Sequence, residues 1–299
     1  MSDFIGTKLT MNLGERSYDI IVKRGSLENL YQFARLDRRV AVVTDSGVPA
    51  QYAQMVADQC KDATIITVPQ GEASKSFKIL ETVLRQMLDF GMGRGDLVVA
   101  VGGGVVGDLA GFAASIYMRG IDFINCPTTT LSMIDSSIGG KTAVDLGDTK
   151  NIVGAFWQPK LVIVDPDTLS TLPRRHFING LAEAVKAGLL ADPELFSIFE
   201  KEDVDDRIGD IICRSLRFKK SIVEQDETEQ GMRKALNFGH TIGHGIEAVK
   251  GIKGRRTTGL FHGECVALGM LPMIESKALR KAGAQCVPPS GSAHPHRLR

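Results

Sequence analysis

Two histidines stand four residues apart in the segment LNFGHTIGH, residues 236–244. If this segment is helical, His240 and His244 lie one turn apart on one face, which is the spacing of a zinc-binding histidine pair. The residues between them are Thr, Ile and Gly, so the segment is not the HExxH motif of metalloproteases. A catalytic zinc needs a third protein ligand. The candidates are His262 in FHGECVALGM and Glu183 in NGLAEAVKAGLL.

The predicted helix also carries a polar stripe. At about 100° per residue, four hydrogen-bonding side chains fall within about 60° of one another, namely Arg233, Asn237, His240 and His244. A core helix would place leucine there, so this face lines either solvent or a polar site. Three glycines each cost the helix about 1 kcal/mol relative to alanine, namely Gly239, Gly243 and Gly245. We therefore expect the backbone here to approach a site closely.

Glu183 and Lys186 lie three residues apart on another predicted helix. On a solvated face they would form a surface ion pair worth a few tenths of a kcal/mol. The surrounding sequence is rich in alanine and predicts burial instead. We interpret the pair as part of a site.

A glycine-rich turn follows the apolar run DLVVAV at residues 96–101. Gly102, Gly104 and Gly107 form a GxGxxG pattern between a predicted strand and a predicted helix, where backbone N–H groups and a helix N-terminus can hold a pyrophosphate. A tight turn with no ligand is the alternative. The segments PTTTLSMIDSSIGGKTAVD and KNIVGAF then place Lys141, Lys150 and Asn151 in loops.

Several basic side chains could surround one cleft, although each lysine taken singly is most simply a solvated surface residue. Together they would form an anion pocket suited to a small phosphate or carboxylate substrate. The residues are Lys141, Lys150, Lys186, Lys219 and Arg233.

The elements that must position these residues change character along the chain. Residues 8–25 predict an antiparallel hairpin, and apolar strands at 38–45, 63–71, 96–104 and 161–165 alternate with helices at 77–91 and 105–120. This alternation predicts a doubly wound, Rossmann-like α/β domain. After about residue 170 the pattern is helical, with a helix start at Asp192 and Pro193. We predict an α/β domain over 1–169, an all-α domain over 170–285, and a disordered tail over 286–299.

Composition limits the possible functions. Lys and Arg number 36 against 35 Asp and Glu, so the net charge is +1 and no global field favours nucleic acid or a membrane surface. Five cysteines without a CxxC pair suit reduced thiols. No segment has the length of apolar sequence needed to cross a bilayer, so we expect a soluble cytoplasmic protein.

Seven motifs occur in an order that resembles one family, the 3-dehydroquinate synthases, from about residue 10 to about residue 275. The motifs are GGGVVGDLAGF, YMRG, PTTTLSMIDSSIGGKTAVD, KNIVGAFWQP, LPRRHFINGLAEAVKAG, DETEQGMRKALNFGHTIGH and FHGE. The resemblance implies a phosphorus–oxygen lyase of the shikimate pathway. Such enzymes convert 3-deoxy-D-arabino-heptulosonate 7-phosphate to 3-dehydroquinate and phosphate, with NAD and a divalent metal, zinc or cobalt. The resemblance also implies a homodimer.

The resemblance assigns roles residue by residue. The metal ligands would be Glu183, His240 and His262, whereas His244 would be a catalytic or substrate-contacting group. Substrate positions would be Asp135, Lys141, Lys186, Lys219, Arg233 and Asn237, with Lys150 and Asn151 at the phosphate end. Arg119 would reach the partner subunit's site. Cofactor contacts would be Asp45, Glu72, Lys75, Gly103, Gly104, Val105, Asp108, Thr128, Thr129, Lys141, Lys150 and Thr171.

The sequence departs from the family pattern towards its end. Family chains continue for several helices, including a lysine that helps to close the site, whereas AQCVPPSGSAHPHRLR does not resemble them. We expect those helices to be missing and activity to be impaired. The basic stretch 245–261 is interpreted as a surface loop. Two alternatives to the synthase are a related sugar-phosphate cyclase and a folded, inactive remnant that still binds NAD and metal. Glycerol dehydrogenase-like enzymes share the two-domain plan.

Overall fold

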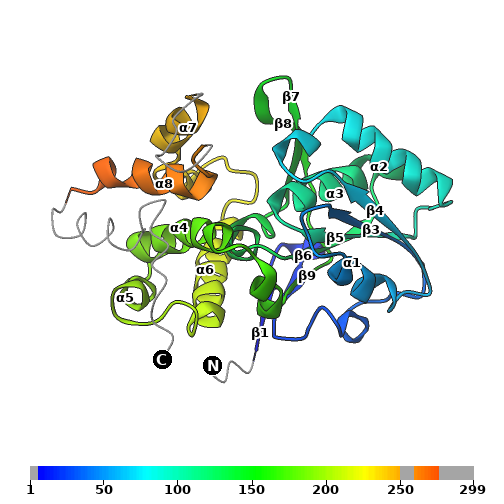
Figure 1. Cartoon of the computed structure of the whole chain (residues 1–299), viewed down its shortest axis with the longest axis horizontal. Coiled ribbons are helices and arrows are strands. Elements are labelled where there is room, and N and C mark those ends of the chain that lie inside the picture. The colour runs from blue at the N-terminus through cyan, green and yellow to red at the C-terminus, as the bar shows by residue number, and fades with distance from the viewer. Residues whose placement is uncertain (1–5, 250–258, 276–299) are drawn as a thin grey trace.

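The computed structural model describes residues 6–249 and 259–275, which form an α/β part and a helical part (Figure 1). The α/β part contains a seven-stranded sheet in the order β1-β2-β9-β6-β5-β3-β4. Only β1 and β2 pair antiparallel in this sheet, which confirms the predicted N-terminal hairpin. The strands are β1 (Thr7–Met11), β2 (Tyr18–Val22), β3 (Arg39–Asp45), β4 (Asp62–Val68), β5 (Leu97–Gly102), β6 (Asp122–Pro127) and β9 (Leu161–Val164).

The order of the parallel strands reverses between β3 and β5, because β4 lies on one side of β3 while β5, β6 and β9 follow on the other. Ligands of open α/β sheets bind at such a switch point, beyond the carboxyl ends of the strands. The GxGxxG turn lies there, since Gly102 ends β5 and Gly104 begins the next helix. The doubly wound α/β class predicted from the sequence is therefore confirmed.

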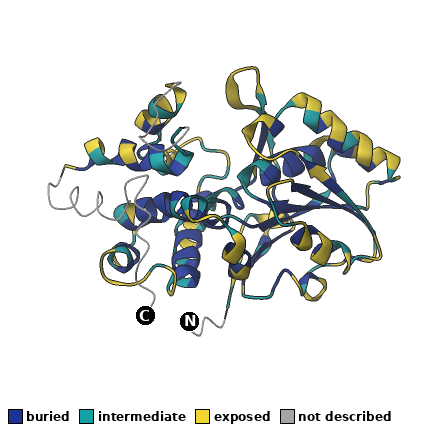
Figure 2. Ribbon diagram, in the orientation of Figure 1, coloured by how far each residue is buried: buried dark blue, intermediate teal, exposed yellow. Residues whose placement is uncertain are grey.

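Helices cover both faces of this sheet. In β3, Ala41 and Val43 pack in the core that includes α2 and α3, whereas Val40 and Val42 pack towards α1 on the opposite face. This alternation follows from the two-residue period of a strand, and it explains why β3 is apolar almost throughout. The helices are α1 (Ala50–Ala57), α2 (Phe77–Asp89) and α3 (Gly104–Ile116). Figure 2 shows the buried central strands and the exposed outer side of α2.

Residues 141–156 form a two-stranded antiparallel sheet made of β7 (Lys141–Leu146) and β8 (Thr149–Phe156). The prediction that KNIVGAF is a loop is therefore wrong, because Lys150 and Asn151 lie in β8. Burial of Ala143 and Val144 anchors β7 in the core, while most of β8 is at least partly exposed. Because β8 begins with polar residues, its sequence does not show the alternation of apolar and polar residues that is typical of a strand.

The helical part contains α4 (Arg174–Leu190), α5 (Pro193–Lys201), α6 (Ile208–Val223), α7 (His240–Ala248) and α8 (His262–Met270). The predicted start at Asp192 is confirmed, because its side chain accepts a hydrogen bond from Leu195 N at the beginning of α5. The boundary predicted near residue 170 falls in the short helix η6 (Pro166–Thr171). The remaining short helices are η1 (Gly14–Arg16), η2 (Leu30–Gln32), η3 (Glu72–Ser74), η4 (Tyr117–Arg119), η5 (Ser132–Ser136), η7 (Met232–Asn237) and η8 (Leu271–Met273).

One hydrophobic core joins the two parts of the chain. Met11, Ile20 and Val22 from the N-terminal hairpin belong to the same buried cluster as Ile212 and Leu216 of α6. Side chains of β9, α4 and α5 complete it. The helical part is thus packed on the β1-β2-β9 side of the sheet (Figure 1).

The predicted continuous helix through residues 233–244 is wrong. Arg233 and Asn237 lie in η7, and α7 begins only at His240. Gly239 separates the two with a left-handed backbone, φ 79°, which glycine adopts at no steric cost. His240 and His244 do share a face of α7, but the other two residues of the predicted stripe are placed independently of it.

The glycines of this region serve contact between helices. A Cβ on Gly239 would lie 2.5 Å from Met270 Cγ, and one on Gly243 would lie 3.0 Å from Cys265 O, so both face α8. A Cβ on Gly245 would meet no atom of the described residues within 4 Å. The expectation that the backbone at these glycines approaches a site closely is therefore corrected, because at two of them the backbone packs closely against α8 instead.

Part of the predicted surface loop is helical, since residues 245–248 belong to α7, and residues 250–258 lie outside the described part of the chain. The tail predicted over 286–299 also lies outside it. Among the described helices, none is long and apolar enough to cross a membrane.

Candidate metal and cofactor site

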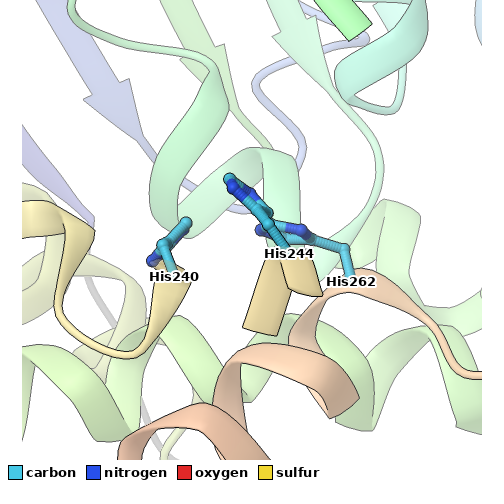
Figure 3. A group of neighbouring side chains, drawn as sticks. All are labelled: His240, His244 and His262. Carbon is cyan, nitrogen blue, oxygen red and sulfur yellow. The ribbon is translucent and has the colours of Figure 1, made fainter. Parts of the chain in front are cut away.

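The predicted metal ligands come from three helices that meet at one place. Glu183 is buried in the middle of α4, while His240 and His262 are the first residues of α7 and α8. Nε2 of His240 lies 3.5 Å from Glu183 Oε1, and Nε2 of His262 lies 3.8 Å from the same oxygen. The side chains of three distant segments therefore converge. Figure 3 shows the two histidines together with His244.

The chemistry of this donor set fits a divalent cation. Both carboxylate oxygens of Glu183 are buried, and neither accepts a hydrogen bond from the described residues, although Lys186 forms an ion pair with Oε2. A buried carboxylate without hydrogen bonds is costly, and a bound cation would satisfy it. Each histidine also has an outer partner: Nδ1 of His240 lies 3.3 Å from Phe238 O, and Nδ1 of His262 lies 3.4 Å from Glu247 Oε2. Such outer partners are typical of histidines that bind metal through the other nitrogen.

His244 offers a second possible ligand set. One ring nitrogen from each of His240, His244 and His262 can be chosen so that all three lie within 4.8 Å of one another. His244 is exposed, however, and within the described residues its ring has no hydrogen-bond partner. It therefore lacks the support that the other two histidines have, which favours Glu183 as the third ligand.

The two supported histidines differ electrostatically. Burial lowers the pKa of His240, and the charge of Glu183 only partly opposes this. Burial also lowers the pKa of His262, but the hydrogen bond to Glu247 and the charge of Glu183 outweigh it, so the net pKa is raised. A histidine must be neutral to bind a metal, and His262 holds its additional proton more readily than His240 does. A cation must therefore displace that proton from His262 in particular.

A pocket beside Glu183 collects other predicted residues. Asp135, Glu183, Lys186 and Lys219 line it. Nζ of Lys219 donates to Asp135 Oδ1 at 2.7 Å and to its carbonyl oxygen at 2.8 Å. Burial would raise the pKa of Asp135, but the ammonium groups of Lys219 and Lys186 hold it below its usual value. Burial lowers the pKa of Lys219 in spite of this carboxylate.

Each of the four lysines of the predicted anion pocket faces a carboxylate in this structure. Lys186 pairs with Glu183 and Lys219 with Asp135, as described above. Lys141 pairs with Glu229, and Lys150 pairs with Glu247 at 2.7 Å. Lys141 and Lys150 are each about half exposed, with side-chain exposures of 50% and 51%. Pairs of this kind are weak, so an arriving phosphate or carboxylate can replace the acidic partner.

Arg233 and Asn237 approach the site differently from the prediction. Arg233 is only 1% exposed, and its guanidinium donates to Gly139 O at 2.9 Å and to Glu227 O. Burial lowers its pKa. Asn237 is exposed and donates to Glu229 Oε1 at 3.3 Å. In this structure Arg233 therefore holds the backbone around the GGK turn, and only Asn237 faces solvent.

The predicted cofactor residues cluster at the carboxyl ends of the strands. Asp45 ends β3, Gly103 is the N-cap of α3, and Thr128 follows β6. A Cβ on Gly103 would lie 3.1 Å from Thr129 Cγ2, and one on Gly104 would lie 3.0 Å from Ser136 Oγ, so the glycine turn closely approaches η5. Val105 continues α3, whereas Thr171 lies farther along and contacts Tyr52 through hydroxyl groups 2.9 Å apart.

Lys75 connects the cofactor loops with the phosphate end. Its ammonium donates to Asp108 Oδ2 at 2.6 Å and to Asn151 Oδ1, and Glu72 lies 3.9 Å away. Burial raises the pKa of Asp108 to about 6, although Lys75 opposes the shift. Asn151 adopts φ 55°, a left-handed conformation that asparagine tolerates. The two predicted sites are therefore adjacent.

Two acidic residues at the site were not predicted from the sequence. Glu247 binds His262 and Lys150, and Glu229 binds Lys141 and Asn237. A signal for Glu247 was present, because it lies seven residues after His240 and so on the same face of α7. Nothing comparable marks Glu229, whose ion-pair partner Lys141 lies 88 residues away in the sequence.

The fold and site define a class of two-part proteins in which a doubly wound α/β unit precedes a helical unit. A 2-deoxy-scyllo-inosose synthase solved with carbaglucose-6-phosphate, NAD+ and Co2+ matches with a TM-score of 0.83 and 26% identity, over 94% of this chain and 80% of that chain. The 2-epi-5-epi-valiolone synthase of Streptomyces hygroscopicus, solved with NAD+ and Zn2+, matches with a TM-score of 0.80 and 28% identity, over 93% and 82%. A probable glycerol dehydrogenase from Sinorhizobium meliloti shares the fold alone, covering 90% and 81%, with 19% identity and a TM-score of 0.61.

Sequence comparison is more specific. The model of the 3-dehydroquinate synthase N-terminal region matches residues 65–179, and the model of its C-terminal region matches residues 180–285. The 3-dehydroquinate synthase of Pelobacter propionicus is 43% identical, covering 93% of this chain and 79% of its own length. That of Thermodesulfovibrio yellowstonii is 43% identical, covering 88% and 76%. The chain belongs to the 3-dehydroquinate synthase family.

Proposed function

We propose that this chain converts 3-deoxy-D-arabino-heptulosonate 7-phosphate to 3-dehydroquinate and phosphate, in the shikimate pathway of the cytoplasm. The observation that carries the proposal is the convergence of Glu183, His240 and His262 next to the pocket lined by Asp135, Lys186 and Lys219. The higher identity to 3-dehydroquinate synthases than to the two other cyclases favours this reaction over theirs.

Glu183, His240 and His262 would hold the divalent cation, zinc or cobalt. The turn at Gly103 and Gly104, with the other cofactor residues predicted above, would hold NAD, whose pyrophosphate suits a helix N-terminus. When bound, NAD would supply a hydride acceptor for the ring carbon that carries a hydroxyl, whose oxygen would lose its proton, and the same cofactor would return the hydride later, while the cation would polarise that oxygen.

The side chains of the protein orient the substrate around this centre. Lys150 and Asn151 would bind the phosphate at the mouth of the site, where Lys150 exchanges Glu247 for the stronger charge of the phosphate. Lys141 is held in the same way by Glu229 and would bind another anionic or hydroxyl group. These contacts would place the reacting carbon in register before any bond changes.

Deeper residues would act on the ring itself. Asp135, Lys186 and Lys219 line the pocket next to Glu183, where burial strengthens their hydrogen bonds to substrate hydroxyl or carboxylate groups. His244 is exposed on the same face of α7 as His240, and we assign it to a substrate hydroxyl, where its imidazole would accept or donate a proton. No additional base is required if the phosphate oxygens of the substrate take the proton removed in the elimination.

We also propose a homodimer in which Arg119 completes the partner's site. Arg119 is exposed at the end of η4, and both it and Met118 adopt left-handed backbone, φ 70° and 52°. Such strain at an exposed turn is typical of a residue aimed at a partner or ligand. Equal mixtures of Arg119→Ala and His244→Ala subunits should recover about one quarter of wild-type activity per site, because one site of each mixed dimer is intact. Recovery of no activity in a mixture that exchanges subunits would contradict this role.

Phosphate release by the purified chain with NAD and zinc tests the proposed reaction. We expect release from the heptulosonate phosphate, no release from glucose 6-phosphate, and no accumulation of NADH. His262→Ala should lose both the metal and turnover, whereas His244→Ala should keep the metal and lose turnover. Failure to release phosphate by protein that binds NAD and zinc would refute the reaction, and accumulating NADH would indicate a dehydrogenase.

A further inference from the structure

Glu247 occupies a junction that the roles assigned above do not explain. It lies on α7, yet its two carboxylate oxygens contact side chains from two other elements: Oε2 lies 3.4 Å from Nδ1 of His262 at the start of α8, and Oε1 lies 2.7 Å from Nζ of Lys150 on β8. Its side chain is 20% exposed. One carboxylate thus touches a predicted metal ligand and a predicted phosphate-binding lysine at once.

The His262 ring spans two carboxylates. Its Nε2 faces Glu183 at 3.8 Å, and its Nδ1 faces Glu247 at 3.4 Å. A neutral imidazole carries one proton, and a carboxylate accepts but does not donate. The proton therefore belongs on Nδ1 when Nε2 presents its lone pair to a cation. Within the described residues, no other group makes a hydrogen bond to this Nδ1.

His240 provides an internal comparison. Its Nδ1 faces the backbone oxygen of Phe238 at 3.3 Å, so the chain itself fixes that ring. His262 begins α8 and depends on a side chain from α7 for the same purpose. Glu247 is seven residues after His240, so α7 presents one ligand and the support of another along one face.

We propose that Glu247 is a positioning residue of the metal centre: it accepts the Nδ1 proton of His262, fixes the ring with Nε2 towards Glu183, and is itself held by Lys150. This inference rests on the metal site proposed above. The alternative is that Glu247 serves only as an ion-pair partner of Lys150 between the two parts of the chain. The two roles predict different effects on metal binding.

The test measures Zn2+ and Co2+ affinity of the purified full chain by competition with a chelator. Loss of an outer carboxylate partner typically weakens metal binding about 10- to 100-fold, and we expect this for Glu247→Ala. Glu247→Gln keeps an acceptor oxygen without the charge, so its loss should be smaller, under about 10-fold. Lys150→Met should weaken metal binding by less than about 3-fold, because the contact with His262 remains. Glu200→Ala, an exposed change on α5, should leave it unchanged.

A second readout separates positioning from general damage to the fold. Nitrogen-15 NMR of the histidine rings reports which ring nitrogen carries the proton. We expect the Nδ1–H form of His262 in the wild-type chain and in Glu247→Gln, and a mixture with the Nε2–H form in Glu247→Ala. A merely structural role would lower the melting temperature without changing this tautomer.

His262→Ala distinguishes failure of the inference from failure of the metal site. If His262→Ala binds zinc as tightly as the wild type, the proposed metal site is wrong. If His262→Ala loses zinc while Glu247→Ala keeps wild-type affinity and the wild-type tautomer, only the role of Glu247 is overturned. Equal losses of metal affinity in Lys150→Met and Glu247→Ala would also overturn it, in favour of the ion-pair role.

Discussion

The close contact between α7 and α8 predicts a large effect of one methyl group. A Cβ on Gly269, in α8, would lie 2.1 Å from Gly239 O and 2.7 Å from Gly243 N. Both of these atoms belong to the backbone, so no side chain can rotate away. A carbon and a carbonyl oxygen need about 3.3 Å, and therefore Gly269→Ala must separate the helices by about 1 Å.

The consequences for stability and for the site can be worked from this displacement. Overpacking costs about 1–3 kcal/mol, and an immovable backbone contact lies at the upper end of that range. Alanine returns about 1 kcal/mol of helix propensity, so we expect a net loss of about 2 kcal/mol. His240 follows Gly239 directly and would move by about 1 Å relative to His262, whereas metal–ligand distances tolerate only about 0.2 Å. Turnover should fall about 100-fold.

Gly245→Ala is the matched control, because it adds the same methyl group to α7 at a position where no atom of residues 6–249 or 259–275 lies within 4 Å. Its free energy of unfolding should rise by up to about 1 kcal/mol and its melting temperature by about 2–4 °C, with unchanged zinc affinity. Thermal unfolding, chelator competition and phosphate release are measured on both variants. Wild-type zinc affinity and turnover in Gly269→Ala would refute the argument that this backbone contact sets the distance between the metal ligands.

Two further predictions concern charge pairs. Lys219→Met leaves the carboxylate of Asp135 without its partner. Breaking a fully buried pair lowers the free energy of unfolding by roughly 3–5 kcal/mol. Because the side chain of Asp135 is about one-third exposed, we expect a smaller decrease of about 2 kcal/mol, measured by urea unfolding. The double variant Lys219→Met with Asp135→Asn should recover at least half of this lost free energy of unfolding. No recovery would show that the loss does not come from the unpaired carboxylate. Asp192→Asn keeps the side-chain oxygen that caps α5 but loses the ion pair with Arg214. We expect this to lower the free energy of unfolding by about 1 kcal/mol at pH 7. Although burial raises the pKa of Asp192, the hydrogen bond from Leu195 N and the contact with Arg214 lower it on balance. The pair therefore stabilises the fold above the unfolded pKa of about 3.9, and its contribution is lost as the pH falls through the lower folded value. A difference between wild type and variant that stays constant from pH 7 to pH 2 would exclude this origin.

The convergence of Glu183, His240 and His262 could be predicted from the sequence, whereas the arrangement of the residues around them could not. Glu183 could be identified because the alanine-rich helix around it predicts burial, and a buried charge needs a partner. The histidines could be identified from their spacing and their neighbours in the sequence. Arg233 was misplaced on the same helix as His240. Periodicity does not reveal that Gly239 is left-handed, since a glycine that ends one helix has the same composition signal as a glycine within one.

The unpredicted features depend on contacts between distant segments. Lys150 and Glu247 are 97 residues apart, so no local pattern shows that they neutralise one another. The β7-β8 sheet escaped prediction because Lys150 and Asn151, at the start of β8, belong to a functional cluster and break the apolar alternation. Polar residues that serve a functional site interrupt the hydrophobic periodicity from which secondary structure is predicted, so prediction fails most readily at such sites.

The buried cluster that joins the N-terminal hairpin to α6 restricts how this chain can be divided or recombined. A cut near residue 170 would separate Met11, Ile20 and Val22 from Ile212 and Leu216, exposing apolar surface on both fragments. A chimera that borrows the helical half of a relative must therefore borrow its first two strands as well. The N-terminal hairpin and the helices after residue 170 therefore share one core, although strands β3, β4, β5 and β6 lie between them in the sequence.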